Sequence, residues 1–329
     1  MARSPRVFTD GLVMSLRSHD IDEIIAAIRF WELESTQIRP GAADGQLCQI
    51  QMEGVQIIYA QLGCTVRTLG SGPPNTIAFG IANNDVGRTV WQGHECHYDQ
   101  IYVNTNREVD FKTPDHYEQF VITVDKTLLF QVADSCQRRD LAKELRQKSV
   151  IDADPQALQQ LRTLLSNALK RHLQAGMNPL ETDSPLPLPG REAETLIHGL
   201  IESIPPSDSS LNQKLRPFKR TRLAKQVEAY MLNHLDTPLS LQDLCEVVGT
   251  SERSLHYAFH DLFDMSPMAY LKAHRLNQVR RQLKAATPEA DRVIDVAKQW
   301  GFHHMGHFSV DYKAMFGESP SITLRRFAG

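Results

Sequence analysis

The sequence predicts an α+β protein in which an N-terminal antiparallel β-barrel with helices precedes a C-terminal all-helical domain. Between Gln46 and Val124, short runs rich in β-branched and aromatic residues alternate with glycine, proline and asparagine. About six to eight short strands at this spacing are typical of an antiparallel barrel or sandwich. From Thr221 onward the apolar residues recur at helical spacing, and this helical part contains two copies of one pattern.

The length and composition allow two folded domains. The chain has 329 residues, of which 41% are hydrophobic, so each domain can bury a core. No apolar run approaches the roughly 20 residues that a membrane helix needs, and no apolar segment follows the basic start. The five cysteines are scattered and form no CxxC pair. We therefore expect reduced thiols, a cytoplasmic location and no membrane partner.

Charge is divided unevenly along the chain. Residues 216–329 hold 16 lysine and arginine residues against 12 acidic residues, whereas the rest of the chain holds 20 against 27. A basic module on an acidic body favours an anionic partner for the module. Chance asymmetry in solvated surface charge would give the same counts, and the counts alone leave both explanations open.

The N-terminal part is expected to begin with a helix and to continue with strands. Residues 20–33 predict an amphipathic helix with isoleucines on one side and Asp20 as the N-cap. The strand candidates that follow are LCQIQM, VQIIYAQL, CTVRTL, TIAFGI, YDQIYVN and QFVITV. Helical patterns return over about 126–145 and 155–173, which places the barrel domain at residues 1–175.

Proline-rich segments mark the connection between the domains. The segment Asn178–Gly190 predicts a loop, and a helix is expected near Glu192–Ser203. The segment Pro205–Ser210 then separates the two domains. We therefore expect residues 176–215 to form a linker with one helix, followed by the helical domain at 216–329.

The helical domain contains an internal repeat. Each copy has a short helix, a glycine turn and a second helix, over about 241–263 and 293–316. Glycine permits a positive φ, so the two helices can cross sharply as in a helix-turn-helix motif. The apolar residues of the second helix recur at i, i+4 and i+8. They are Leu255, Phe259 and Phe263 in the first copy, and Phe308, Tyr312 and Phe316 in the second.

A basic helix is predicted between the two copies. It begins at Pro267 and extends for about 18 residues, or roughly 27 Å. This length could hold the second helices of both copies near the ~34 Å separation of successive major-groove faces of DNA. A plain helical bundle without a ligand fits one copy, but it fits two copies and a basic connecting helix poorly.

The C-terminal part of the chain resembles a known family. The segments that carry the resemblance are Ser266–Leu276, Ala297–Phe302, His307–Tyr312 and Phe316–Arg325, all within Leu241–Arg326. They resemble the DNA-binding domain of AraC/XylS-type transcriptional regulators. Within that family, Arg275–Leu283 and Val296–Phe308 are most similar to the ethanolamine-utilisation regulators.

The resemblance extends weakly into the N-terminal part, at Ile77–Ala82 and Phe111–Tyr117. It implies an N-terminal domain that senses a ligand and contributes to dimerisation, and a regulator, most simply an activator, that binds promoter DNA. The partners that it implies are RNA polymerase, an unidentified small-molecule effector and a second copy of the chain.

The resemblance also implies which side chains face DNA. Arg253, in the first motif, can pair with guanine through two hydrogen bonds. The equivalent outward positions of the second motif are Gly306, Ser309 and Val310, which lack long polar side chains. The residues expected to contact DNA are Glu252, Arg253, His256, Tyr257, Lys272, His304, Met305, Gly306, His307 and Ser309.

Two histidine clusters invite a metal interpretation. His303, His304 and His307 have no carboxylate or cysteine at a helpful spacing, and their place in the second motif favours contact with DNA. The segment His94–His97 could be half of a metal site if the barrel were cupin-like. The alternative function is then a cupin-like metal-dependent enzyme with a helical appendage. The glutamate and glycine that should follow such a site are absent, so no metal, cofactor or catalytic residue is predicted.

A ligand pocket in the barrel would be lined by inward-facing strand residues. The candidates for effector contact are Tyr59, Phe79, Trp91, Tyr102 and Phe120. Burial preference alone favours a core role for each of them. A third hypothesis, a DNA-organising protein without a sensor, is disfavoured because such a protein has no need of an aromatic interior.

Overall fold

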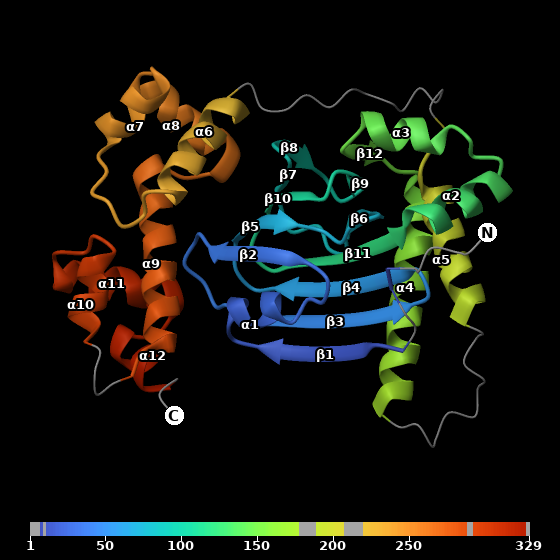
Figure 1. Ribbon diagram of the computed structural model, residues 1–329, viewed down its shortest axis with the longest axis horizontal. Helices are drawn as coiled ribbons and strands as arrows, with labels where there is room; N and C mark the ends of the chain where they lie inside the picture. Colours follow the sequence, from blue (N-terminus) through green and yellow to red (C-terminus); the bar gives the residue numbers. More distant parts are fainter. Residues whose placement is uncertain (1–6, 9–10, 178–188, 207–219, 288–291, 327–329) are drawn as a thin grey trace. The chain divides into compact units, whose positions relative to one another are not determined.

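The computed structural model shows a chain that folds into two compact units (Figure 1). The described residues are 7–8, 11–177, 189–206, 220–287 and 292–326. The N-terminal unit contains Met1–Ser35, Asp44–Leu62 and Thr68–Arg216, and the C-terminal unit contains Thr36–Ala43, Gly63–Arg67 and Pro217–Gly329. Most of the expected loop at 178–190 and of the expected boundary segment at 205–210 lies outside the described residues.

Two antiparallel sheets are formed in the described part of the chain (Figure 1). The first has seven strands, in the order β1 (Val13–Ser18), β3 (Gly45–Met52), β4 (Val55–Leu62), β11 (Tyr117–Asp125), β6 (Thr76–Ala82), β9 (Gln100–Asn104) and β12 (Val150–Asp152). The second has five, in the order β2 (Glu32–Gln37), β5 (Val66–Ser71), β10 (Glu108–Lys112), β7 (Thr89–Trp91) and β8 (His94–Cys96).

One face of the seven-stranded sheet packs against helices. Ile57 lies opposite Ile122, and Ile122 lies opposite Phe79 on the next strand, and all three are fully buried. Because successive side chains of a strand point to opposite faces, this register gathers one set of apolar side chains against the helices. The helices of this core are α2 (Lys126–Ser135), α3 (Leu141–Gln147), α4 (Pro155–Met177) and α5 (Pro189–Ser203).

The two sheets do not close into the expected barrel. The seven-stranded sheet ends at β1 on one edge and at β12 on the other, and the five-stranded sheet ends at β2 and β8. β12 has three residues and is followed almost at once by α4, so too little strand is available at that edge to continue the pairing. The N-terminal unit is therefore a two-sheet α+β structure, and its cupin-like character stays a prediction.

Two sequence expectations in the N-terminal unit are corrected. The helix predicted over 20–33 is shorter: α1 (Ile21–Ala26) begins at Asp20, whose carboxylate accepts the N–H of Asp22, and it ends before Phe30, which has a positive φ of 71°. The helix expected in a linker is α5, and it belongs to the core of the N-terminal unit, where its leucines and isoleucines pack against α4 and α2.

From Thr221 onward, the described part of the C-terminal unit is helical (Figure 1). Its helices are α6 (Thr221–Leu232), α7 (Leu241–Val248), α8 (Glu252–Phe263), α9 (Pro267–Ala285), α10 (Val293–Gln299), α11 (Met305–Phe316) and α12 (Pro320–Arg326). α9 contacts α8, α10, α11 and α12, and it buries ten side chains along its length. None of the described helices combines the length and the apolar character needed to cross a membrane.

A buried ion pair stabilises the C-terminal unit. The Arg67 guanidinium donates to both carboxylate oxygens of Glu228, at 2.8 and 2.9 Å, and both side chains are almost fully buried. The Tyr270 hydroxyl, on α9, donates to the same carboxylate. Removing one partner of such a pair leaves an uncompensated buried charge, which costs about 3–5 kcal/mol.

His274 makes the stability of the C-terminal unit depend on pH. It is buried on α9 beside Tyr270, and burial, followed by the charges of Arg67 and Arg281, lowers its pKa from 6.5 to about 3. In the unfolded chain His274 binds a proton below about pH 6.5, whereas the folded unit keeps it neutral until about pH 3. Stability therefore falls as the pH drops through this window, by up to about 1.4 kcal/mol per pH unit.

We expect His274→Gln to reduce this loss of stability between pH 6.5 and pH 4.5. The measurement is urea unfolding followed by the fluorescence of Trp300 in a chain whose Trp31 and Trp91 are replaced by phenylalanine. The exposed His256 supplies the matched control, because His256→Gln should retain the wild-type dependence of the free energy of unfolding on pH. If the free energy of unfolding depended on pH equally in wild type and His274→Gln, His274 would not be the source of this pH dependence.

Candidate functional site

The first pair of repeated helices has its ends fixed by capping side chains. α7 begins at Ser240, whose hydroxyl accepts the N–H of Asp243 while the Asp243 carboxylate accepts the N–H of Ser240. α7 ends at Gly249, which has a positive φ of 62° and lets the chain turn sharply. α8 then begins at Ser251, whose hydroxyl accepts the N–H of Ser254. The first copy of the repeat is therefore a helix-turn-helix motif.

The second pair repeats the arrangement with a different start to its second helix. α10 is followed by Gly301, which has a positive φ of 82°. α11 begins after His304, whose side chain makes no capping hydrogen bond within the described structure. The second copy is also a helix-turn-helix motif, and its turn and first helical residues carry the three neighbouring histidines.

The exposed face of α8 carries polar and aromatic side chains. Glu252, Arg253, His256 and Tyr257 are exposed, whereas Leu255 is fully buried. The Arg253 guanidinium donates to the Tyr257 hydroxyl at 3.3 Å and lies 5.5 Å from the centre of its ring. This contact orders a long side chain in advance, which lowers the entropy cost of using it in recognition. The four residues predicted to face DNA from α8 share one exposed surface.

The exposed face of α11 is smaller and less polar. His304, Gly306, His307 and Ser309 are exposed, as predicted for DNA contact, and Met305 is half-buried. Val310 belongs to the same face and is 69% exposed, the highest value among the exposed large apolar side chains of the described structure. Sequence reasoning identified Val310 as outward but did not count it among the contacts. The signal was its place one position after Ser309, on the face opposite the buried Phe308.

The predicted contact residue Lys272 is engaged inside the domain. Its ammonium group lies 3.0 Å from the Asp311 carboxylate, so α9 and α11 are joined by a half-exposed ion pair. Other basic residues of α9 are also structural. Arg275 donates to the carbonyl groups of Leu235 and Thr237, at 2.8 and 2.5 Å. The connecting helix is therefore basic in sequence, but much of its charge is used within the protein.

Arg280 is another basic residue of α9 that is buried within the protein. It is 8% exposed, lies 3.1 Å from the Glu318 carboxylate, and has its guanidinium 4.8 Å from the centre of the Phe316 ring. Together with Arg275, it shows that a count of basic residues overstates the charge that this helix offers to an anionic partner.

The histidines of the second motif are not gathered as metal ligands. The ring centres of His304 and His307 are 6.4 Å apart, with the rings almost perpendicular. Among the residues that the structure describes, no group of three or more histidine, cysteine or acidic side chains is placed to hold a metal ion. At the other cluster, His94 is half-buried and His97 is exposed. Burial raises the pKa of the neighbouring Cys96 thiol to about 12, which keeps it in the neutral form.

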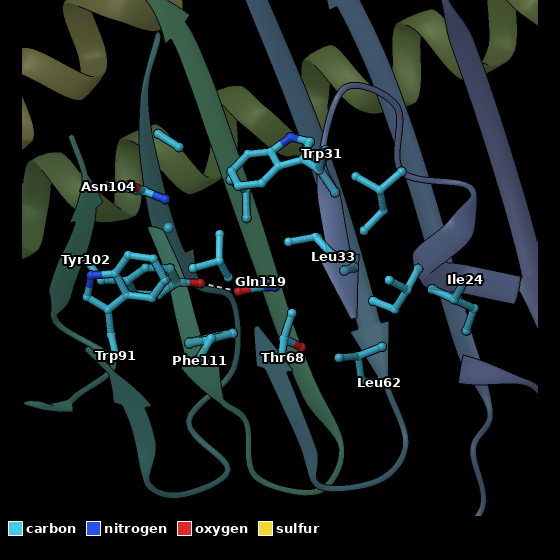
Figure 2. A pocket seen from close by; sticks show the side chains of 18 residues that line it. Ile24, Trp31, Leu33, Leu62, Thr68, Trp91, Tyr102, Asn104, Phe111 and Gln119 are labelled. Atoms are coloured by element: carbon cyan, nitrogen blue, oxygen red, sulfur yellow. Dashed lines mark hydrogen bonds between the residues drawn. The ribbon is translucent and has the colours of Figure 1, made fainter. Parts of the chain in front are cut away.

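A cavity lies between the two sheets of the N-terminal unit (Figure 2). It has a volume of about 80 Å³, measured as the space open to the centres of water molecules. Strands of both sheets line it, together with Ile24 and Ile25 of α1 and Ile28, which follows that helix. One water needs about 10–15 Å³ by this measure, so the cavity can hold a small organic molecule.

The five residues predicted to contact an effector divide between the cavity and the helical core on the other face of the seven-stranded sheet. Trp91 and Tyr102 line the cavity. Tyr59, Phe79 and Phe120 instead pack in the core beside the helices, so the prediction that they line the pocket is wrong. The reason is the two-residue period of a strand, which sends neighbouring side chains to opposite faces. Sequence reasoning missed the polar residues Thr68, Asn104 and Gln119 and the aromatic Trp31, all of which line the cavity.

Comparison with known proteins identifies the C-terminal unit. Residues 244–326 match the family model described as a helix-turn-helix domain. The protein named "Probable thc operon regulatory protein" from Rhodococcus erythropolis is 38% identical over 96 residues, which are 29% of each chain. The XylDLEGF operon transcriptional activator 3 of Pseudomonas putida is 32% identical over 102 residues, which are 31% of each chain.

The C-terminal unit contains a helix-turn-helix domain that is similar to part of the XylDLEGF operon transcriptional activators. A crystal structure of a probable AraC family transcriptional regulator from Rhodopseudomonas palustris CGA009 is 37% identical to this chain, covering 33% of it and 99% of that chain, with a TM-score of 0.31. The chain spans less than a third of the length of the two curated relatives. The similarity to ethanolamine-utilisation regulators stays a prediction.

The helix-turn-helix domain contains an arginine with internal hydrogen bonds and an arginine on an exposed face, and unfolding measurements can distinguish them. We expect Arg275→Ala to lower the free energy of unfolding by about 1–3 kcal/mol, because the carbonyl groups of Leu235 and Thr237 lose their donor. Arg253→Ala, on the exposed face of α8, should change it by less than about 0.5 kcal/mol. Urea unfolding of the two variants measures the difference, and comparable losses would show that Arg253 also has a structural role.

Proposed function

We propose that the protein is a transcriptional regulator, acting as an activator, that binds promoter DNA through both motifs of its C-terminal unit. A small molecule in the cavity of the N-terminal unit controls that binding. The observation that carries this proposal is the pair of exposed faces on α8 and α11, each opposite a buried apolar stripe. A helix fits the major groove, and two such helices on one domain can read two successive turns.

The two motifs are proposed to read DNA in different ways. α8 offers Arg253, His256 and Tyr257, whose donors and acceptors suit hydrogen bonds to base edges and phosphates. α11 offers Gly306 and Val310, which suit close approach and contact with a thymine methyl group. His304, His307 and Ser309 add phosphate contacts. The first motif would then carry most of the hydrogen-bonded sequence discrimination.

Gly306 supports this division because the fold itself has no need of a glycine there. It lies in the first turn of α11, with no positive φ, and a Cβ built at this position would meet no atom within 4 Å. Glycine costs a helix interior roughly 1 kcal/mol relative to alanine. Close approach of a DNA backbone or base to α11 at this position would account for the glycine.

Other parts of the proposal rest on family resemblance. A second copy of the chain and RNA polymerase are proposed as partners, and the names of the Pseudomonas putida relatives as transcriptional activators favour activation. A cupin-like origin of the N-terminal unit and an ethanolamine-utilisation type of regulation are finer proposals of the same kind.

The DNA-binding proposal predicts a defined binding site. Selection of sites from a random DNA pool with the full-length protein should enrich one sequence, whose affinity falls steeply as salt rises from 50 to 200 mM. Arg253→Ala should weaken binding to that site by about 5- to 150-fold and relax the preference at one base.

Arg139→Ala is the matched control, because Arg139 is an exposed arginine of the N-terminal unit. It should leave the affinity for the selected site unchanged. Failure to enrich any sequence at low salt, with or without cell metabolites, would contradict the proposed function.

Gly306→Ala separates DNA contact from domain stability. We expect the variant to raise the free energy of unfolding by up to about 1 kcal/mol, because alanine favours the helix and meets no neighbouring atom. The same variant should bind the selected DNA more weakly. Thermal unfolding and a gel-shift titration measure the two effects. If the variant were more stable but bound DNA with unchanged affinity, the proposed close approach of DNA to α11 would be contradicted.

A further inference from the structure

The lining of the N-terminal cavity excludes a charged ligand. Its 18 lining residues are mostly isoleucine, leucine, valine, alanine and aromatic side chains. Within the described part of the chain, no lysine, arginine, histidine or acidic residue is among them. Burying a carboxylate or an ammonium group there would leave it without a counter-charge, which is strongly unfavourable. The ligand that fits is therefore uncharged.

Aromatic side chains form one wall of the cavity. The ring centres of Trp91 and Tyr102 are 5.4 Å apart, and those of Tyr102 and Phe111 are 5.1 Å apart. Trp31 packs against the same cluster of side chains and lines the cavity (Figure 2), and its indole N–H is donated to Gln56 at 2.8 Å. Rings at these separations pack well against a further aromatic ring, in an offset or edge-to-face arrangement.

Most polar groups of the lining already have partners inside the protein. The Thr68 hydroxyl is hydrogen-bonded to the Ser35 hydroxyl at 2.7 Å. The Tyr102 hydroxyl donates to the Gln119 side chain, as the dashed line in Figure 2 marks. These groups are therefore not free to bind a ligand without breaking an internal bond.

Asn104 is different from these residues. It is 5% exposed, and neither the nitrogen nor the oxygen of its side-chain amide has a hydrogen-bond partner among the described residues. Its side chain points toward the interior of the cavity (Figure 2). Buried polar atoms nearly always have a partner. An amide with both a free donor and a free acceptor is suited to one ligand group that accepts and donates together.

From these contacts we propose that the cavity binds an uncharged, single-ring aromatic molecule whose amide or hydroxyl group pairs with Asn104. The inference rests on the proposed function, since it names the class of small molecule that would act as effector. The ring packs against Trp91, Tyr102 and Phe111, and the polar group meets the amide of Asn104, which is two residues after Tyr102 on β9. The volume of about 80 Å³ limits the ligand to no more than one ring with a short substituent.

Three probes of similar shape test the proposal on the full-length protein at neutral pH. Benzamide has the ring and the amide, benzoate replaces the amide by a carboxylate, and toluene has no polar group. Calorimetric titration should give benzamide a dissociation constant of about 1 mM or tighter. Benzoate should bind at least tenfold more weakly. Fluorescence of Trp31 and Trp91 in a Trp300→Phe chain reports whether the cavity is the site.

Variants of the lining separate the role of Asn104 from general packing. Asn104→Leu keeps the approximate volume and removes both hydrogen-bonding atoms. It should weaken benzamide binding about tenfold, the ratio expected for one or two lost hydrogen bonds, and leave toluene binding unchanged or tighter. Ala60→Phe places a ring in the cavity and should abolish binding of both molecules. Retained toluene binding by Asn104→Leu would show that this variant is folded.

Three outcomes would overturn the proposal: equal affinities for benzoate and benzamide, no binding of any probe, or unchanged benzamide affinity in Asn104→Leu. The DNA titrations are made separately, without a probe, so that loss of DNA binding would count only against the proposed function. If benzamide binds but leaves the DNA affinity unchanged, the proposed ligand class would stand and its proposed regulatory role would be contradicted.

Discussion

The C-terminal unit depends on the burial of one apolar stripe on each recognition helix against the rest of the domain. Leu255 and Phe259 on α8, and Phe308 and Tyr312 on α11, are almost completely buried. Each stripe fixes the rotation of its helix, and the rotation decides which side chains remain outside. The exposed positions on α8 and α11 are therefore consequences of core packing. This is why a spacing of four residues in the sequence was enough to predict them.

The same reasoning failed in the N-terminal unit, where the sheet is buried on both faces. β6 (Thr76–Ala82) has no exposed residue, because one face packs on helices and the other faces the cavity. A strand buried on both faces reads as a continuous apolar run, so its sequence does not reveal which side chain points where. Tyr59 and Phe120 could be predicted as interior residues, but not assigned to the helical core rather than to the cavity.

Three-dimensional contacts also decided which polar groups are free. Arg280 looked like part of a basic surface, yet it is buried against Glu318 and Phe316. Asn104 is the last residue of the predicted strand YDQIYVN, and its amide is buried at the cavity without a partner in the described structure. No local pattern distinguishes these cases, because the partner of Arg280 is 38 residues away and the unpaired state of Asn104 depends on strands from both sheets.

The ion pair between Lys272 and Asp311 changes how Lys272 should contribute to DNA binding. Asp311 lies on α11, the helix proposed to enter the major groove, where a bare carboxylate would be repelled by phosphates. Lys272 neutralises that carboxylate from α9 at 3.0 Å, and both groups remain partly exposed. Its effect on DNA affinity would then come from removing a repulsion, with a direct phosphate contact available only if the pair opens. An exposed pair of this kind is worth less than about 1 kcal/mol, so opening it on DNA costs little.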